Sequence, residues 1–159
     1  MKQKMSKFLT DSKPVLKKLI EELSKEFEYV SILGTDSKGK SYSVRKTAVS
    51  VGDSFSTERG FVLRVYNGLG YSEYSFDVID GENIKKEIRR IAKTDIEFLK
   101  SKNLERIKYP VIEEEALTKS FYAEVKESFD SMNDEQKIKR LESVMKKGFD
   151  YCPEMIDFQ

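Results

Sequence analysis

The sequence predicts an α+β fold, in which an antiparallel β-sheet of about four strands is covered on one face by helices. Two observations carry this prediction. The patterns along the chain run in the order helix, about four strand-like segments, helix and further helix. The pair Asn67-Gly68 stands between two strand-like runs, which is a strong signal for a hairpin and hence for antiparallel strands. A length of 159 residues suits a single domain spanning 1–159.

Three amphipathic segments are predicted to be helices. The first has Ser12 as its N-cap and Pro14 in its first turn, where the missing N–H of proline costs nothing. The second has an apolar stripe opposite a strongly basic side. Asn133 caps the third, and Gly148 fits the position just past its C-terminus. The helices are expected over 11–27, 80–101 and 133–147.

The strand-like segments are rich in β-branched and aromatic residues. The turn at Asn67-Gly68 is predicted to be type I′, since both residues tolerate the positive φ that this turn requires. Residues 102–132 are ambiguous, because Tyr109-Pro110 interrupts any helix and 121–125 fits a strand almost as well as a helix. The strands are expected over 28–33, within 41–53, over 61–66 and over 69–78, with a polar turn over 34–39.

The composition removes most catalytic chemistry. The chain has no histidine and a single cysteine, Cys152, so it can build neither a Ser-His-Asp nor a Cys-His nucleophile, nor a zinc site. One cysteine also excludes an intrachain disulfide, which favours a reducing compartment, the cytoplasm. Lysine and arginine number 29 and the acids 28, so the net charge of +1 gives no overall attraction to nucleic acid. No apolar run is long enough to span a membrane, and the N-terminus lacks the apolar core of a secretion signal.

The central segments contain two candidate sites. In the stretch 56–64, Glu58 could act as a base and Arg64 could bind an anion. The favoured interpretation is a turn that leads into a strand, with Arg64 in an inward or cross-sheet ion pair. Aromatic residues on a sheet can stack single-stranded nucleic acid, but no RNP-type pattern is present, so packing is favoured. These aromatic residues are Phe61, Tyr66, Tyr71, Tyr74 and Phe76.

The charged clusters and the cysteine give weaker signals. Five cations within 85–93 could bind phosphate, but a solvated helix face is favoured because acids balance the charge overall. The acids Glu113–Glu115, with Asp130 and Asp134, could bind Ca²⁺ or Mg²⁺ but lack EF-hand spacing. Cys152 is expected to be structural or incidental. The chain has neither a P-loop nor a dinucleotide-binding glycine motif. The five cations are Lys85, Lys86, Arg89, Arg90 and Lys93.

The stretch 57–72 resembles the N-terminal domain of the TldD/PmbA family, whose members were first described as modulators of DNA gyrase and as microcin-maturation proteases. The shared pattern is a glycine, an alternating apolar strand with an arginine, a glycine-containing turn and a Gly-aromatic-small start of the next strand. The flanking segments are similar too, so that the resemblance covers most of 12–149. It departs from the family at 61–63, where Phe-Val-Leu replaces a more usual run of small residues. The motif residues are Gly60, Arg64, Asn67, Gly68 and Gly70.

The resemblance implies a zinc-dependent peptidase system. In this family the zinc centre, a His-Glu-x-x-x-His helix with a later cysteine, lies in a C-terminal domain of a longer chain. Because this chain has no histidine, no catalytic or metal residue is carried over to it. The 159 residues are therefore expected to be an N-terminal domain from a longer parent, without a cofactor of their own.

The resemblance also implies partners. The family's N-terminal domain helps to form a homo- or heterodimer with another TldD/PmbA-type subunit and roofs a cavity that holds unfolded peptide. Such a peptide can be held as an added β-strand through backbone hydrogen bonds. An alternative remains open, in which the chain is a stand-alone binding module for nucleic acid or for a protein such as DNA gyrase; of these two, nucleic acid is the less expected.

Overall fold

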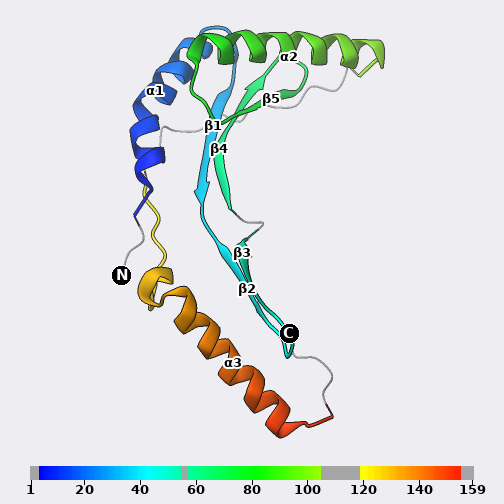
Figure 1. Ribbon diagram of the computed structural model, residues 1–159. Helices are drawn as coiled ribbons and strands as arrows, with labels where there is room; N and C mark the ends of the chain where they lie inside the picture. The colour runs from blue at the N-terminus through cyan, green and yellow to red at the C-terminus, as the bar shows by residue number, and fades with distance from the viewer. Residues whose placement is uncertain (1–3, 55–56, 105–118, 155–159) are drawn as a thin grey trace. The chain divides into compact units, whose positions relative to one another are not determined.

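The computed structural model describes residues 4–54, 57–104 and 119–154, and it confirms the α+β class (Figure 1). The chain divides into two compact units. The sheet unit contains the described residues within 5–36 and 58–119, and the hairpin unit contains those within 1–4, 37–57 and 120–159. The elements are α1 (Lys7–Leu23), β1 (Val30–Ser37), β2 (Lys40–Val44), β3 (Val49–Asp53), β4 (Glu58–Tyr66), β5 (Tyr71–Phe76), α2 (Gly81–Ser101), the 3₁₀ turn η1 (Phe129–Ser131) and α3 (Asp134–Tyr151).

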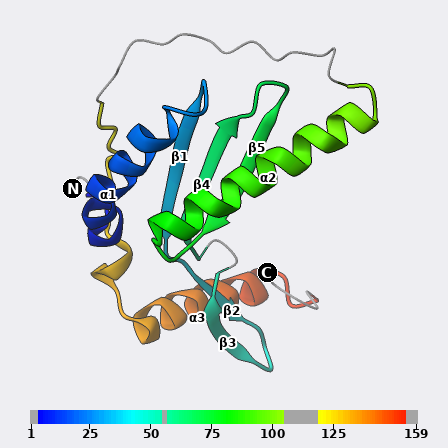
Figure 2. The same ribbon diagram turned by 90° about the horizontal axis from the view of Figure 1, so that it is seen from above.

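The sheet unit is built on a three-stranded sheet in the order β1-β4-β5 (Figure 2). Strands β4 and β5 are antiparallel and in register from the pair Phe61 and Phe76 to the pair Tyr66 and Tyr71. On the other side of β4, the backbone N–H of Tyr66 donates to the carbonyl of Tyr29 at 3.0 Å, just before β1 begins. The end of β4 therefore lies beside the start of β1, as antiparallel pairing requires.

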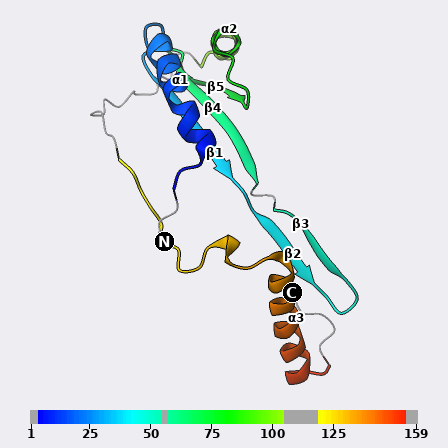
Figure 3. The same ribbon diagram turned by 60° about the vertical axis from the view of Figure 1, so that its left-hand side comes forward.

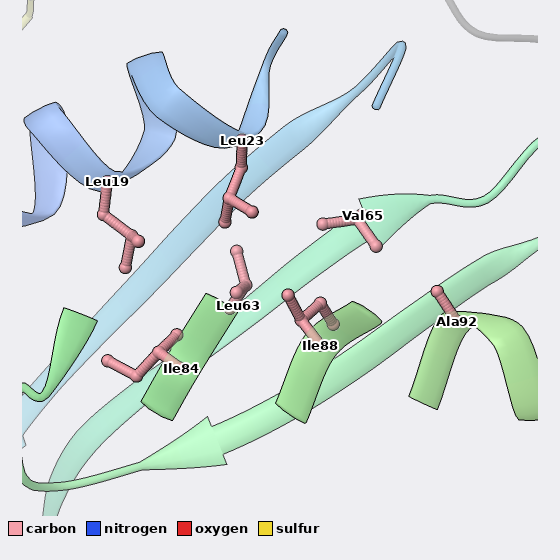
Figure 4. Packing of buried hydrophobic residues seen from close by; sticks show 7 residues of the cluster. All are labelled: Leu19, Leu23, Leu63, Val65, Ile84, Ile88 and Ala92. Carbon is pink, nitrogen blue, oxygen red and sulfur yellow. The ribbon is translucent and has the colours of Figure 1, made fainter. Parts of the chain in front are cut away.

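Helices α1 and α2 cover one face of this sheet, as the sequence predicts. Leu19 and Leu23 project from α1 toward Leu63 and Val65 of β4 (Figure 4). Ile84, Ile88 and Ala92 meet the same two strand residues from α2. Their spacing of about four residues places them on one face of α2. These seven side chains form the core of the sheet unit.

Helix α1 begins earlier than the sequence predicts. Its N-cap is Ser6, whose side chain accepts a hydrogen bond from the N–H of Leu9. Ser12 is buried inside the helix and donates to the carbonyl of Phe8 at 2.7 Å, so its assignment as the cap was wrong. The extra turns are stabilised by a distant partner, because the ring of Phe8 stacks on that of Phe61 at 5.1 Å.

Strand β1 continues through most of the predicted polar turn. Gly34 lies inside the strand, and a Cβ built there would lie 2.8 Å from Cε1 of Phe61. Asp36 is held by Arg59, which donates to its carboxylate at 3.0 Å. Pairing with β4 therefore extends the strand, because the neighbouring strand supplies both an aromatic ring that needs a glycine opposite it and a countercharge for the aspartate.

The hairpin unit contains β2, β3 and α3 (Figure 3). The predicted segment 41–53 is two antiparallel strands, and the turn between them includes a hydrogen bond from the N–H of Arg45 to the carbonyl of Ala48. Asn133 caps α3 in a capping box with Gln136, as expected from its side chain. Gly148 is inside α3 rather than past its end, so that prediction was wrong; Lys46 lies 4.1 Å from the ring centroid of Phe149, which belongs to the added turn.

The ambiguous segment 102–132 is described only in part. Tyr109-Pro110 and the acids Glu113–Glu115 lie outside the described residues. Within 121–125 the structure has a single isolated β-bridge at Glu124 and no helix. No helix in the described part of the chain is both long and apolar enough to cross a membrane.

Candidate functional site

The motif residues come together in the β4–β5 hairpin, and Asn67 organises its turn. The Oδ1 atom of Asn67 accepts hydrogen bonds from the N–H groups of Leu69 and Gly70, at 3.0 and 2.9 Å. Its backbone N–H donates to the carbonyl of Gly70 at 2.9 Å. One short polar side chain thus satisfies two backbone donors of the loop, which is the reason asparagine suits such turns.

The turn is shifted by one residue from the predicted type I′ arrangement. Its central residues are Gly68 and Leu69, flanked by the bonded pair Asn67 and Gly70. Gly68 has a φ of +93°, but Asn67 does not lie in the left-handed region, since Asn103 is the one non-glycine with positive φ among the described residues. The predicted positive φ at Asn67 was therefore wrong. Asparagine contributes here through its side-chain hydrogen bonds and not through its backbone conformation.

A polar chain of hydrogen bonds links this turn to α2. Asn67 Nδ2 donates to Ser72 Oγ at 2.9 Å, and Ser72 Oγ donates to Asp95 Oδ2 at 2.5 Å. Ser72 is 1% exposed, so its hydroxyl would be costly to bury without these partners. Gly70 lies close to the same helix, where an added Cβ would meet Cδ1 of Leu99 at 3.5 Å. The hairpin is thereby anchored to α2 by the Ser72 hydroxyl, whereas a Cβ at Gly70 would make only an ordinary van der Waals contact with the helix.

The other two motif residues lie along β4. A Cβ at Gly60 would lie 3.2 Å from the carbonyl oxygen of Phe76 on the neighbouring strand, so the position favours glycine. Arg64 forms an ion pair with Glu73, its partner in the strand register, at 2.5 Å. This confirms the expected cross-sheet ion pair. Glu58 is exposed at the start of β4, and Ser56 lies outside the described residues.

The five aromatic residues of the central strands are divided between the two faces of the sheet. Phe61 is buried and contacts the rings of Phe8 and Phe76 on the helix-covered face. On the other face, Tyr66 and Tyr71 lie 5.4 Å apart between ring centroids, and Tyr29 meets Tyr71 edge-on at 5.7 Å. No single aromatic platform is formed by the set, which agrees with the expectation that these residues serve packing.

Most cations of the basic helix face are paired with carboxylates. Lys85 contacts Glu22 and Glu82, and Arg89 makes two hydrogen bonds to Glu26. These contacts lower the pKa of the Glu22 and Glu26 carboxyls, chiefly through the hydrogen bonds from Lys85 and Arg89. Arg90 pairs with Glu87 one turn earlier. Two of these cations therefore link α2 to α1 and to the residues just after it, and pairs also form within α2. The helix face offers less unpaired positive charge than the sequence suggests.

The hairpin unit contains a polar cluster that sequence reasoning missed. Asp134 accepts hydrogen bonds from Lys40 Nζ at 2.5 Å and from the hydroxyl of Tyr42 at 2.6 Å. The bond from Lys40 is the largest cause of the lowered pKa of the Asp134 carboxyl, and Asp134 in turn raises the pKa of the Tyr42 phenol and of Lys40. The Tyr42 phenol therefore holds its proton more tightly than a free tyrosine and donates it to Asp134, and the cluster attaches α3 to β2.

The other candidate residues do not form a metal site in the described part of the chain. No group of three or more His, Cys, Asp or Glu side chains gathers there in a way that could hold a metal ion. Asp134 is engaged by Lys40 and Tyr42, and Asp130 lies in the η1 turn. Cys152 is a partly buried free thiol at the C-terminal end of α3.

The geometry defines an α+β chain whose motif residues stabilise one hairpin and whose three-stranded sheet has β1 and β5 at its edges. Comparison with protein-family models, with curated proteins and with solved structures finds no match to this chain. The resemblance to the TldD/PmbA family therefore stays a prediction, and the function is inferred from the residues and their arrangement.

Gly68→Val is expected to lower the free energy of unfolding by about 1–2 kcal/mol, because a β-branched residue resists a φ of +93°. An added Cβ would meet no atom within 4 Å, so backbone strain alone should set this cost. Urea denaturation followed by circular dichroism measures it. An unchanged midpoint would show that the turn does not need its left-handed residue.

Asp134→Asn is expected to lower the melting temperature at neutral pH and to have little effect in strong acid. Because the pKa of Asp134 is lowered in the folded state, its carboxylate adds stability above about pH 4, and this is lost as pH falls through the lowered value. Melting curves from pH 7 to pH 2 test this, with Asp130→Asn as the control. A difference between Asp134→Asn and the parent that stays constant with pH would contradict the assignment.

Proposed function

We propose that this chain is the non-catalytic N-terminal part of a TldD/PmbA-like zinc peptidase system, and that it holds unfolded peptide and contributes to subunit association. The observation that carries the proposal is the β4–β5 hairpin. Gly60, Arg64, Asn67, Gly68 and Gly70, which match the family pattern, lie in this one hairpin. Gly60 and Gly68 occupy positions that favour glycine, Arg64 pairs with Glu73, and Asn67 accepts the hydrogen bonds of the turn. A pattern spread over unrelated surface positions would have given no such support.

Peptide holding is supported by the edge of the sheet. Strand β1 has eight residues, and in the part of the chain that the structure describes β4 is its one neighbour in the sheet order. An edge strand carries backbone donors and acceptors along its open side, and an extended peptide can pair with them as an added strand. Backbone pairing is largely indifferent to peptide sequence, which suits a protein that receives many unfolded chains.

Zinc and peptide cleavage are placed outside these 159 residues, because the chain has no histidine and one cysteine. The proposed parent would supply the metal in a C-terminal domain and would pair with a second TldD/PmbA-type subunit in the cytoplasm. Reading the source gene beyond the codon for Gln159 tests this. A continuing frame that encodes a His-Glu-x-x-x-His helix is expected, and a stop codon at that point would contradict the proposal.

Peptide holding has its own test. The 159-residue chain is titrated into fluorescein-labelled unstructured peptides, and binding is followed by fluorescence anisotropy. Peptides with N-methylated backbones are the matched control, because methylation removes the amide donors that an added strand needs. We expect the unmethylated peptides to bind and the methylated ones to bind at least tenfold more weakly, since several backbone hydrogen bonds are lost. Equal binding of both would exclude strand addition.

The alternative function is a binding module for nucleic acid or for DNA gyrase. Its nucleic-acid form is tested by measuring how binding of single-stranded DNA depends on salt concentration. Binding through phosphate contacts strengthens steeply as salt is lowered. Since Lys85, Arg89 and Arg90 are paired with carboxylates, we expect negligible binding of single-stranded DNA even at low salt. Tight, salt-dependent binding would favour the alternative.

A further inference from the structure

An apolar groove lies between α1 and the edge strand β1, within the sheet unit. Its volume is about 360 Å³, and Ile32 and Gly34 form its β1 side. Figure 2 shows α1 beside β1, at the edge of the sheet away from β5. The groove is thus next to the strand edge at which the proposed function places an unfolded peptide. Its remaining apolar lining is Met5, Leu9, Leu16, Ile20 and Phe61.

The rim of this groove is basic. Lys13 and Lys17, one turn apart on α1, line it and are exposed to solvent. Among the described residues neither lysine has a carboxylate within ion-pairing distance, in contrast to Lys85 and Arg89 on α2. An apolar floor with two free cations at its edge is complementary to a ligand that combines apolar side chains with negative charge.

A peptide that pairs with β1 as an added strand would place half of its side chains on the same face of the sheet as the groove. Residues of a strand added to β1 would alternate between the two faces of the sheet, so every second side chain would lie on the face that carries Ile32 and Gly34. That face is the one covered by α1. The space above Gly34 is filled by Phe61 and Leu9, so these two side chains form the apolar floor of the groove at the middle of β1.

We propose that the groove between α1 and β1 selects extended peptides with apolar residues at alternate positions and acidic residues flanking them. This inference rests on the proposed function, because it assumes that peptide adds to the β1 edge. It goes further by naming the preferred substrate class and the residues that choose it. Ile32 and Ile20 contact the apolar side chains, and Lys13 and Lys17 attract the flanking acids.

The test uses the whole 159-residue chain and three fluorescein-labelled peptides of equal length. The first alternates leucine and serine and has two glutamates at each end; the second replaces the glutamates by lysines, and the third replaces the leucines by serines. We expect the first to bind about tenfold more tightly than either of the others, as two exposed charge contacts and a few buried side chains allow. The difference between the acidic and the basic peptide should shrink at about 0.5 M salt.

Variants locate the effect. The double variant Lys13→Glu with Lys17→Glu should reverse the order of the acidic and the basic peptide. Its control, Lys86→Glu with Lys93→Glu, makes the same charge change at exposed positions of α2 and should leave the order unchanged. Circular dichroism verifies that both double variants fold. Amide hydrogen exchange should slow in β1 when the acidic peptide binds.

The outcomes separate the two proposals. If unmethylated peptides bind but all three have equal affinity, or if the Lys13 and Lys17 variant keeps the original order, the groove is not the selecting element and peptide holding survives. If none of the peptides binds, or if N-methylation has no effect, peptide holding at the β1 edge fails and the groove proposal fails with it. Protection of β5 instead of β1 would also overturn the groove proposal.

Discussion

Leu63→Ala is expected to lower the free energy of unfolding by about 3–4 kcal/mol, the largest effect of any single change considered for this chain. Leu63 is 0% exposed at the centre of β4, where α1 and α2 both meet the sheet. Truncation removes apolar burial and leaves a cavity that neither helix can fill, because each is held by its own contacts. Urea denaturation followed by far-ultraviolet circular dichroism measures the loss.

The control is Leu33→Ala in β1, where the side chain is 68% exposed. The same chemical change there should alter stability by less than about 0.5 kcal/mol. Similar losses at Leu33 and Leu63 would mean that the core does not lie between the sheet and the two helices. In that case the β1 edge would not be supported by a packed core, and the proposed binding of peptide there would lose its structural basis.

Asn67→Ala is expected to lower the free energy of unfolding by about 2 kcal/mol, the second largest effect. The substitution removes the acceptor for two backbone N–H groups of the turn and the donor to Ser72. The Ser72 hydroxyl then keeps Asp95 as its partner but loses an incoming hydrogen bond in a buried position. Thermal and urea denaturation both report this cost.

The matched control is Asn83→Ala, in the first turn of α2. The amide side chain of Asn83 makes no hydrogen bond within the described residues, and alanine is a better helix former. Its stability should be unchanged or slightly raised. If Asn67→Ala behaves in the same way, the hydrogen-bonded turn does not stabilise the hairpin, and the structural support for the motif is lost.

The hairpin and the β1 edge have different roles in the proposed function. The Ser72–Asp95 hydrogen bond fixes β5 against α2, and β5 is paired with β4, which in turn is the neighbour of β1. The motif residues therefore act on peptide only through the sheet that they stabilise. Asn67→Ala should change the free energy of unfolding more than it changes the free energy of peptide binding, when binding is measured well below the melting temperature. The double variant Lys13→Glu with Lys17→Glu should change the free energy of peptide binding more than the free energy of unfolding.

Much of the candidate site could be read from the sequence because its signals are local. Asn67-Gly68 indicated a hairpin, and a cross-sheet ion pair was expected at Arg64. The hairpin register supplies its partner, Glu73. The groove was not predicted, because Leu9 and Met5 precede the expected start of the first helix. The apolar residues upstream of Ser12, at the same spacing as Leu16 and Ile20, were the signal that could have extended it.

The α+β class, the position of α2, the cap of α3 and the absence of any histidine-based chemistry were all readable from the amino-acid sequence. These follow from periodicity, capping side chains and composition, which act within a few residues or need no structure. Long-range contacts were needed to establish that β1 runs to Ser37 and that the chain forms two units. Each of these depends on partners distant in sequence, such as Phe61 beside Gly34, and no local pattern records which distant residues will meet.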